Sequence, residues 1–306
     1  MNNYLPEGSL ISTAENIARL RTPLTIADCF AKSTVLEARA TVCDAQHNLI
    51  VDLGCMKGII PRPEGAIGIE DGSVRDIAII SRVGKPVCFV ITSIDVDENG
   101  QPIATLSRRL AQEECMRNYI EKLHCGDVIN AVITHLEPFG AFCDIGCGIP
   151  SLMPIDAISV SRISHPKDRF SPGDKIKAVV KSVENNRITL SQKELLGTWE
   201  ENARMFSQGE TVSGVIRSIE NYGVFVELTP NLAGLAEPKA DILPSQTASV
   251  YIKSIIPEKM KIKLIIIDSF ETIEPPKPPV YFLDGDHIDS WQYSPLGAGK
   301  VIETVF

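Results

Sequence analysis

The chain lacks long apolar segments. No run reaches the roughly 18 residues that a membrane-spanning helix needs, and Met1 to Tyr4 do not begin a basic segment followed by an apolar one, so we expect neither a membrane span nor a secretory signal. The eight cysteines are scattered and form no C-x-x-C pair. Dispersed cysteines in a chain of this size are typical of reduced thiols, which predicts a cytoplasmic protein.

Positive charge is also scarce. Lysine and arginine number 30 against 39 aspartates and glutamates, which gives a net charge of -9. This balance argues against a protein that holds nucleic acid by charge alone. A nucleic-acid site in this chain would make few phosphate contacts and would depend on local stacking.

Catalytic and metal motifs are missing as well. We find no H-E-x-x-H pair, no dinucleotide fingerprint and no nucleophile–base–acid set. Gly297 to Lys300 resembles the end of a phosphate loop, but Ser294 and Val301 occupy positions where that loop requires glycine and Ser/Thr. Asp284, Asp286, His287 and Asp289 could suggest a metal site, but a loop with a single histidine is more typical of a turn. We expect no enzyme activity, no cofactor, no metal and no small-molecule substrate.

Short strands dominate what is present. Three successive sets of five alternating segments begin near Val35, Gly126 and Gly209, and five short strands in such a length predict a small closed barrel. Gly126 and Gly209 lie 83 positions apart, and so do Phe139 and Tyr222. Landmarks that share one spacing indicate an internal repeat.

The predicted fold class is therefore all-β with linking helices, as three tandem five-stranded barrels. We expect a helical arm at 1–34 that packs on the first barrel, barrels at 35–108, 125–193 and 209–270, linker helices at 109–124 and 194–208, and a Pro-rich linker and tail at 271–306. The tail is rich in aromatic residues, which predicts that it packs on another part of the chain, with the third barrel as the first choice. The alternative is that 274–279 is a PxxP-like ligand segment, which another protein would bind.

Two aromatic residues flank a glycine turn in the central set. Phe139 and Phe142 lie three residues apart across Gly140, and Tyr222 and Phe225 repeat the pattern across the turn at Gly223. Flat rings on a strand–turn–strand platform can stack on unpaired bases. One ring of such a pair often belongs to the core, but the repetition favours a surface role.

Basic residues give further candidates for contacts to RNA. Arg187 and Lys261 begin the last strands of the central and third sets, which makes them candidate phosphate contacts. A basic loop in the central set offers Arg162, His165, Lys167 and Arg169. A solvated loop is an equally good interpretation of these four residues.

The central set is similar to the RNA-binding domain named after bacterial ribosomal protein S-one, an OB-fold barrel. The residues that carry the resemblance are Gly126-Asp127-Val128, Phe139-Gly140-Ala141-Phe142, Asp144-Ile145-Gly146, Ser161-Arg162-Ile163, His165-Pro166, Asp168-Arg169-Phe170, Gly173-Asp174 and Arg187-Ile188-Thr189-Leu190-Ser191. The third set matches through Tyr222–Phe225 and Gly234–Ala236. The first, more divergent set matches through Gly58–Arg62 and Leu106–Arg109. The whole chain resembles short members of the S-one family with three domains.

The resemblance implies an RNA face made of two turn aromatics, a histidine on the third strand, and an acidic and a basic residue at the last hairpin. In the central set these positions hold Phe139, Phe142, Pro154 in place of the histidine, Glu184 and Arg187. In the third set they hold Tyr222, Phe225, Glu237, Pro257 and Lys261. The first set has Asn48 and Leu49 at the aromatic positions, which suggests a docking surface for protein.

The function that the resemblance implies is binding of single-stranded RNA, including messenger RNA, in translation on the ribosomal small subunit. Two alternatives stay open. The barrels could form a protein-binding scaffold on the ribosome, or the chain could be an RNA-processing cofactor that serves a separate nuclease.

Overall fold

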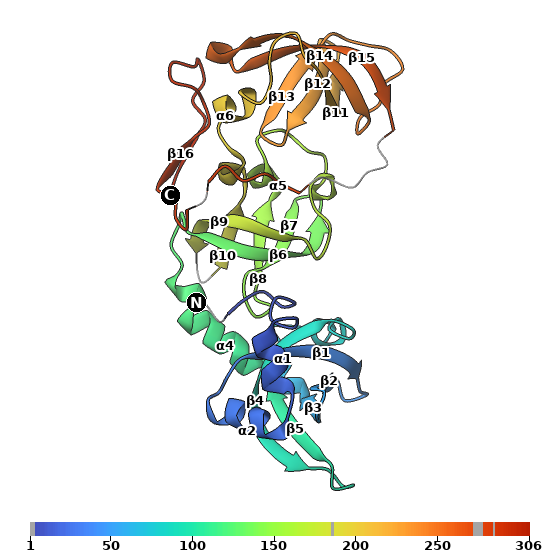
Figure 1. Cartoon of the computed structure of the whole chain (residues 1–306), viewed down its shortest axis with the longest axis vertical. Helices are drawn as coiled ribbons and strands as arrows, with labels where there is room; N and C mark the ends of the chain where they lie inside the picture. The colour runs from blue at the N-terminus through green and yellow to red at the C-terminus, as the bar shows by residue number, and fades with distance from the viewer. Residues whose placement is uncertain (1–3, 185–186, 272–277, 284) are drawn as a thin grey trace. The chain divides into compact units, whose positions relative to one another are not determined.

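The computed structural model describes residues 4–184, 187–271, 278–283 and 285–306. The predicted turn at Asn185-Asn186, most of the proline segment at 274–279, and Asp284 lie outside these described residues. Three closed barrels of five strands account for most of the described chain and confirm the predicted fold class (Figure 1). No helix in the described ranges is long and apolar enough to cross a membrane.

The three barrels share one topology. In the first barrel the strand order is β1-β2-β3-β5-β4, and in the third it is β11-β12-β13-β15-β14. A parallel contact between the third and fifth strands closes each barrel, as in β3 with β5 and β13 with β15. The strands are β1 (Leu36–Cys43), β2 (Leu49–Asp52), β3 (Lys57–Ile60), β4 (Pro86–Val96), β5 (Pro102–Ser107), β6 (Val128–Glu137), β7 (Gly140–Asp144), β8 (Pro150–Pro154), β9 (Lys175–Glu184), β10 (Arg187–Ser191), β11 (Thr211–Glu220), β12 (Gly223–Thr229), β13 (Leu232–Ala236), β14 (Thr247–Ile256) and β15 (Lys261–Phe270).

Helices and turns connect these strands. The α-helices are α1 (Ala14–Leu20), α2 (Pro23–Ala31), α3 (Ile77–Ile80), α4 (Arg108–Asn118), α5 (Ile155–Ile158) and α6 (Trp199–Ala203). The 3-10 helices are η1 (Arg62–Glu64), η2 (Ile120–Lys122), η3 (Pro166–Asp168), η4 (Lys193–Leu196) and η5 (Pro257–Lys259), and two short strands, β16 (Ser290–Gln292) and β17 (Glu303–Val305), pair in the tail.

The chain divides into two compact units. The first comprises residues 1–123 with 130–132 and 144–150, and the second comprises 124–129, 133–143 and 151–306. Fully buried aliphatic and aromatic side chains, among them Leu36, Phe89 and Leu106, fill the first barrel. Burial of such side chains is the main favourable term in folding.

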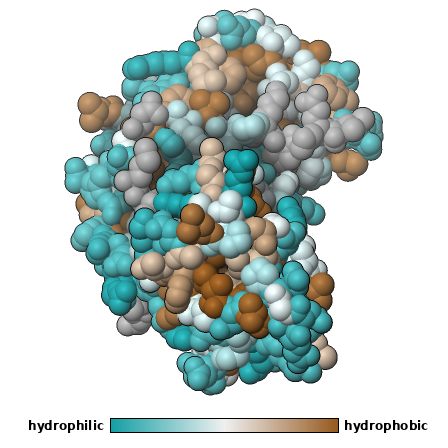
Figure 2. All heavy atoms as spheres, turned by 60° about the horizontal axis from the view of Figure 1, so that its bottom comes forward, coloured by the Kyte–Doolittle hydropathy of each residue, from teal (hydrophilic) through white to brown (hydrophobic). Residues whose placement is uncertain are grey.

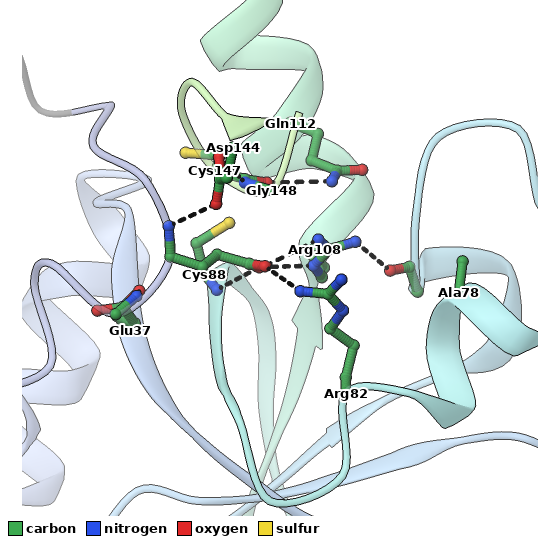
Figure 3. A network of polar contacts seen from close by, with 12 residues as sticks. Glu37, Ala78, Arg82, Cys88, Arg108, Gln112, Asp144, Cys147 and Gly148 are labelled. Atoms are coloured by element: carbon green, nitrogen blue, oxygen red, sulfur yellow. Dashed lines mark hydrogen bonds and ion pairs between the residues drawn. The ribbon is translucent and has the colours of Figure 1, made fainter. Parts of the chain in front are cut away.

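The N-terminal arm is anchored on the first barrel by two buried carboxylates, as predicted for an arm that packs there. Glu37 on β1 accepts the backbone N–H groups of Leu10 (2.8 Å) and Ile11 (2.6 Å). Glu7 forms ion pairs with Arg108 (2.7 Å) and Arg82 (2.9 Å), as Figure 3 shows for the surrounding network. In the same network Asp144 accepts the N–H of Glu7 at 2.8 Å.

The second linker forms less helix than predicted. Instead of one helix over 194–208, the 3-10 turn η4 is followed by the five-residue α6, whose N-cap Thr198 accepts the N–H of Glu201. Gly197 separates them at φ +82°, and a Cβ at this position would lie 2.8 Å from the ring of Phe282. A regular helix cannot pass through this left-handed residue, so the linker bends there.

The C-terminal tail packs more widely than predicted. Trp291 and Tyr293 are buried in the same apolar cluster as Val226 of the third barrel, but the tail also contacts the central barrel. The hydroxyl of Tyr281 accepts the N–H of Lys177 at 2.9 Å, and the N–H of Val128 donates to the carbonyl of Asp286 at 2.9 Å. The tail therefore joins the central and third barrels within the second unit.

A buried ion-pair cluster also joins these two barrels. Arg169 follows η3 of the central barrel and pairs with Glu227 on β12, and Arg217 on β11 donates to both oxygens of the same carboxylate at 2.9 and 3.0 Å. The Glu227 side chain is only 6% exposed. Burial alone would raise the pKa of the Glu227 carboxyl, but the two arginines outweigh burial and lower it below the ordinary value of 4.5.

We expect the Glu227→Gln variant to lose about 1–3 kcal/mol of stability in the second unit, because two buried arginines lose their charged partner. A carboxyl with a lowered pKa stabilises the fold above its unfolded pKa and loses this effect as pH falls through the folded pKa. The difference in free energy of unfolding between wild type and variant should therefore shrink from pH 7 toward pH 3. Urea unfolding measures this difference when it is followed by the fluorescence of Trp199 and Trp291, which both lie in this unit.

Glu200→Gln is the matched control for this experiment. Glu200 pairs with Arg204 at 3.3 Å on the exposed side of α6, where ion pairs contribute little. Equal effects of the two substitutions would contradict the role of the buried cluster.

Candidate nucleic-acid interface

The turn between β6 and β7 is held against β8. A Cβ on Gly140 would lie 2.5 Å from the carbonyl oxygen of Met153, so only glycine allows this close approach. Gly223 has the same role in the third barrel, where a Cβ would lie 2.6 Å from the carbonyl oxygen of Ala236. Both hairpins therefore present the residues beside the glycine at a defined place on the barrel surface.

The two predicted ring pairs have nearly the same geometry. Phe139 and Phe142 lie edge to face, with ring centroids 6.0 Å apart and an interplanar angle of 87°. Tyr222 and Phe225 give 6.2 Å and 88°. The first ring of each pair is well exposed, 56% for Phe139 and 68% for Tyr222, and the second is half-buried. These rings lie at the surface and are not part of a barrel core, so their faces and edges are available to a ligand.

Strand pairing aligns one outward row of residues in each barrel. In the third barrel, Ser218, Phe225, Leu235 and Lys263 follow one another across β11, β12, β13 and β15. The 83-residue repeat places His135, Phe142 and Leu152 at the same positions of the central barrel, where Leu152 neighbours Thr189. The row of the first barrel is Val42, Ile50, Ile59 and Thr105.

This pairing corrects the sequence alignment of the first barrel. Leu49 was expected at an aromatic position, but it is fully buried and corresponds to Val224. Ile50 stands where the third barrel has Phe225, and His47 precedes the strand as Tyr222 does. Five residues separate the strand partners Cys43 and Leu49, whereas four separate the equivalent partners Ile219 and Val224. This one-residue difference shifted the alignment by one position.

The outer surface of the first unit is partly apolar. Figure 2 brings this unit forward and shows hydrophobic atoms gathered near the middle of a mostly hydrophilic face. Exposed apolar residues of the unit include Val42 (52%) and Ile77 (64%). His47 pairs with Asp76 at 3.2 Å, and Arg62 pairs with the same carboxylate at 2.8 Å. The first barrel therefore presents aliphatic groups where the other two present rings.

The charged hairpin residues lie at equivalent ends of two ribbons. Glu184 and Arg187 are cross-strand partners at the end of β9 and β10, and Lys261 pairs with Ile256 at the end of β14 and β15. All three side chains are exposed. Within the described ranges neither Arg187 nor Lys261 forms an ion pair, so both cations are available to an anionic ligand.

The basic loop of the central barrel is only partly available. Arg162 and Lys167 are exposed, but His165 is half-buried and its Nδ1 accepts the N–H of Lys167 at 3.1 Å, which caps η3. Arg169 was a candidate contact, yet its side chain is 10% exposed and paired with Glu227. Long-range pairing with the third barrel thus removes Arg169 from the candidate RNA surface.

One residue of the platform was missed by sequence reasoning. The ring of His135 on β6 is stacked beside that of Phe142, with centroids 6.2 Å apart and an interplanar angle of 30°. The two lie seven positions apart, and only the register of the hairpin makes them neighbours. The available signal was the repeat, which relates His135 to Ser218, the cross-strand partner of Phe225.

Comparison with known proteins finds a family match for the central barrel. Residues 122–193 match the family described as S1 RNA binding domain. The match covers all five strands of the central barrel, including the Phe139–Phe142 hairpin and Arg187. The central barrel is thus similar to the S1 RNA binding domain over its whole length.

The similarity of the chain to known proteins extends beyond this S1 match. It is 28% identical over 247 residues to small ribosomal subunit protein bS1 of Staphylococcus haemolyticus, covering 76% of this chain and 61% of that protein. It is 30% identical over 236 residues to the bS1 homolog of Bacillus subtilis, covering 74% and 57%. The chain therefore spans about three fifths of the length of these curated relatives. A solved multidomain protein with nucleic acid binding domains from Streptococcus pneumoniae shares 14% identity and covers 79% of this chain and 76% of its own, at a TM-score of 0.26 that is too low to support an inference.

Proposed function

We propose that the protein binds single-stranded RNA through its central and third barrels and acts in translation on the small ribosomal subunit, with messenger RNA as a ligand. The observation that carries the proposal is the pair of edge-to-face aromatic platforms, one of which belongs to the S1 domain. Unpaired bases stack on such rings without regard to sequence.

The proposed contacts divide by their chemistry. Phe139, Phe142, Tyr222 and Phe225 stack on bases, and Arg187 and Lys261 contact phosphates at the hairpin ends. Glu184 lies beside Arg187 and accepts hydrogen bonds from base or sugar groups, and Arg162 and Lys167 add further positive charge. The half-buried His165 holds that loop in place. Two weak sites on one chain strengthen each other, because binding at the first raises the local RNA concentration at the second.

The first barrel favours a second, additional role. Three of the four residues in its outward row, Val42, Ile50 and Ile59, are aliphatic, and Val42 is 52% exposed. Exposed apolar surface of this kind fits a protein partner better than RNA. We therefore propose that the first barrel contacts protein on the ribosome, which would place the chain in the cytoplasm.

Co-sedimentation with purified small ribosomal subunits tests the role in translation. We expect the full chain to pellet with the subunits, and the Val42→Asp/Ile59→Asp variant to pellet less while still binding free RNA. A chain that binds RNA but never pellets with subunits would favour an RNA-processing role instead.

We expect the affinity for unstructured RNA to depend only weakly on salt. Two to four phosphate contacts predict a slope of log K against log [salt] of about -1.5 to -3, since each contact to a single strand contributes about -0.7. Fluorescence anisotropy of a labelled RNA between low and moderate salt measures the slope. A slope steeper than about -5 would show that charge, and not stacking, dominates the interface.

A further inference from the structure

We propose that His135 is a third stacking group of the central RNA site and holds the base next to the one on Phe142. The inference rests on the proposed RNA-binding function and extends it by one residue and one nucleotide. Pro154 stands at the position on the third strand of the central barrel where the resemblance implies a histidine. In this proposal the histidine of the site comes from β6 instead.

The geometry of the rings supports this role. The imidazole lies 6.2 Å from the Phe142 ring at 30°, so the two rings form one nearly continuous surface. Phe139 stands edge-on to Phe142 at 87°. The His135 side chain is 63% exposed, so its outer face is open. A strand of unpaired bases that stacks on Phe142 would meet His135 next.

A hydrogen bond holds the imidazole in this position. His135 Nε2 lies 2.6 Å from Oε1 of Glu137, two residues further along the same strand. Because a carboxylate only accepts hydrogen bonds, Nε2 donates to Glu137. Nδ1 has no hydrogen-bond partner within the described residues and is open to a group on the RNA, such as a ribose hydroxyl, which can donate or accept.

The third barrel contains half of this arrangement. The repeat aligns Glu220 with Glu137, and Ser218 with His135. Ser218 is the cross-strand partner of Phe225, and Glu220 lies opposite Gly223 at the turn. The third barrel therefore keeps the acid and the second ring but has a serine where the central barrel has the histidine.

This difference provides both a loss test and a gain test. We expect His135→Ala to weaken binding of a labelled oligouridine RNA about fivefold, the low end of what one stacked base contributes. His135→Phe should retain binding, because the ring surface remains. In a Phe139→Ala/Phe142→Ala background, where the third barrel is the remaining site, Ser218→His should strengthen binding by a similar factor.

The controls separate this inference from the proposed function. His124→Ala removes a histidine that is 82% exposed in the same unit and should leave binding unchanged. Tryptophan fluorescence checks that each variant keeps the second unit folded. Wild-type binding with no loss in His135→Ala, or equal loss in His135→Ala and His135→Phe, would overturn the role of His135 as a stacking group while RNA binding stands. No binding by the wild type at low salt would overturn the proposed function itself.

Discussion

The Phe139→Ala/Phe142→Ala variant should bind unstructured RNA at least about 30-fold more weakly than the wild type. Each base stacked on an aromatic ring contributes about 1–3 kcal/mol, and this hairpin holds two rings at the surface. The acidic chain offers few phosphate contacts to compensate, since its net charge is -9. Titration of a labelled oligouridine RNA at fixed low salt, followed by fluorescence anisotropy, measures the loss.

Phe270→Ala is the matched control for the aromatic pair. Phe270 ends β15 in the same unit, is 53% exposed and makes no ring contact within the described residues. Its removal tests whether any exposed phenylalanine contributes to binding. Similar losses in Phe270→Ala and in the double variant would show that the hairpin is not a specific platform, and an unchanged double variant would refute stacking there.

The Glu7→Ala variant should lose about 3–5 kcal/mol of stability in the first unit, because it leaves the buried Arg108 without its charged partner. The Glu7 and Arg108 side chains are 4% and 3% exposed, and Arg108 donates to both carboxylate oxygens at 2.7 and 3.0 Å. Arg82 and the N–H of Cys88 donate to the same group. Figure 3 labels Arg82, Cys88 and Arg108, which lie close together in this network. Burial would raise the pKa of the Glu7 carboxyl, but Arg108 and Arg82 reverse this and lower it.

The readout must follow the first unit separately, because both tryptophans lie in the second. Hydrogen exchange of peptides from β1 and β4, measured by mass spectrometry in increasing urea, serves this purpose. Glu15→Ala is the control, since Glu15 pairs with Arg19 at 2.7 Å but is 72% exposed on α1. Equal exchange in Glu7→Ala and Glu15→Ala would contradict an anchoring role for Glu7.

Local sequence patterns were sufficient for the repeat and its main surface feature. The spacing between Phe139 and Tyr222 reflects the repeated order of strands and turns, and each of these elements has a local sequence pattern. A glycine turn with an aromatic on each side has few conformations, so the surface position of both ring pairs could be predicted. The strand segments and the closed barrels followed from alternation and from the number of short segments.

Positions that depend on register could not be predicted in the same way. The ring of His135 meets that of Phe142 across the hairpin. Ile50 takes the place of Phe225 because the first hairpin has one more residue between equivalent strand partners. A shift of one residue moves a side chain from the surface to the core, as it does for Leu49. Local sequence patterns do not show at which residue the register of a strand pair shifts.

The sequence by itself determined the fold class, the three-fold repeat and the two aromatic hairpins, since each depends on residues that are close along the chain. Only the tertiary structure decided that Arg169 is buried against Glu227, that the tail joins two barrels, and that the ring of His135 lies beside that of Phe142. These outcomes depend on contacts between segments up to about 160 positions apart, such as Asp127 with His287. Such partners are set by packing and charge pairing across the folded chain, which local sequence patterns do not contain.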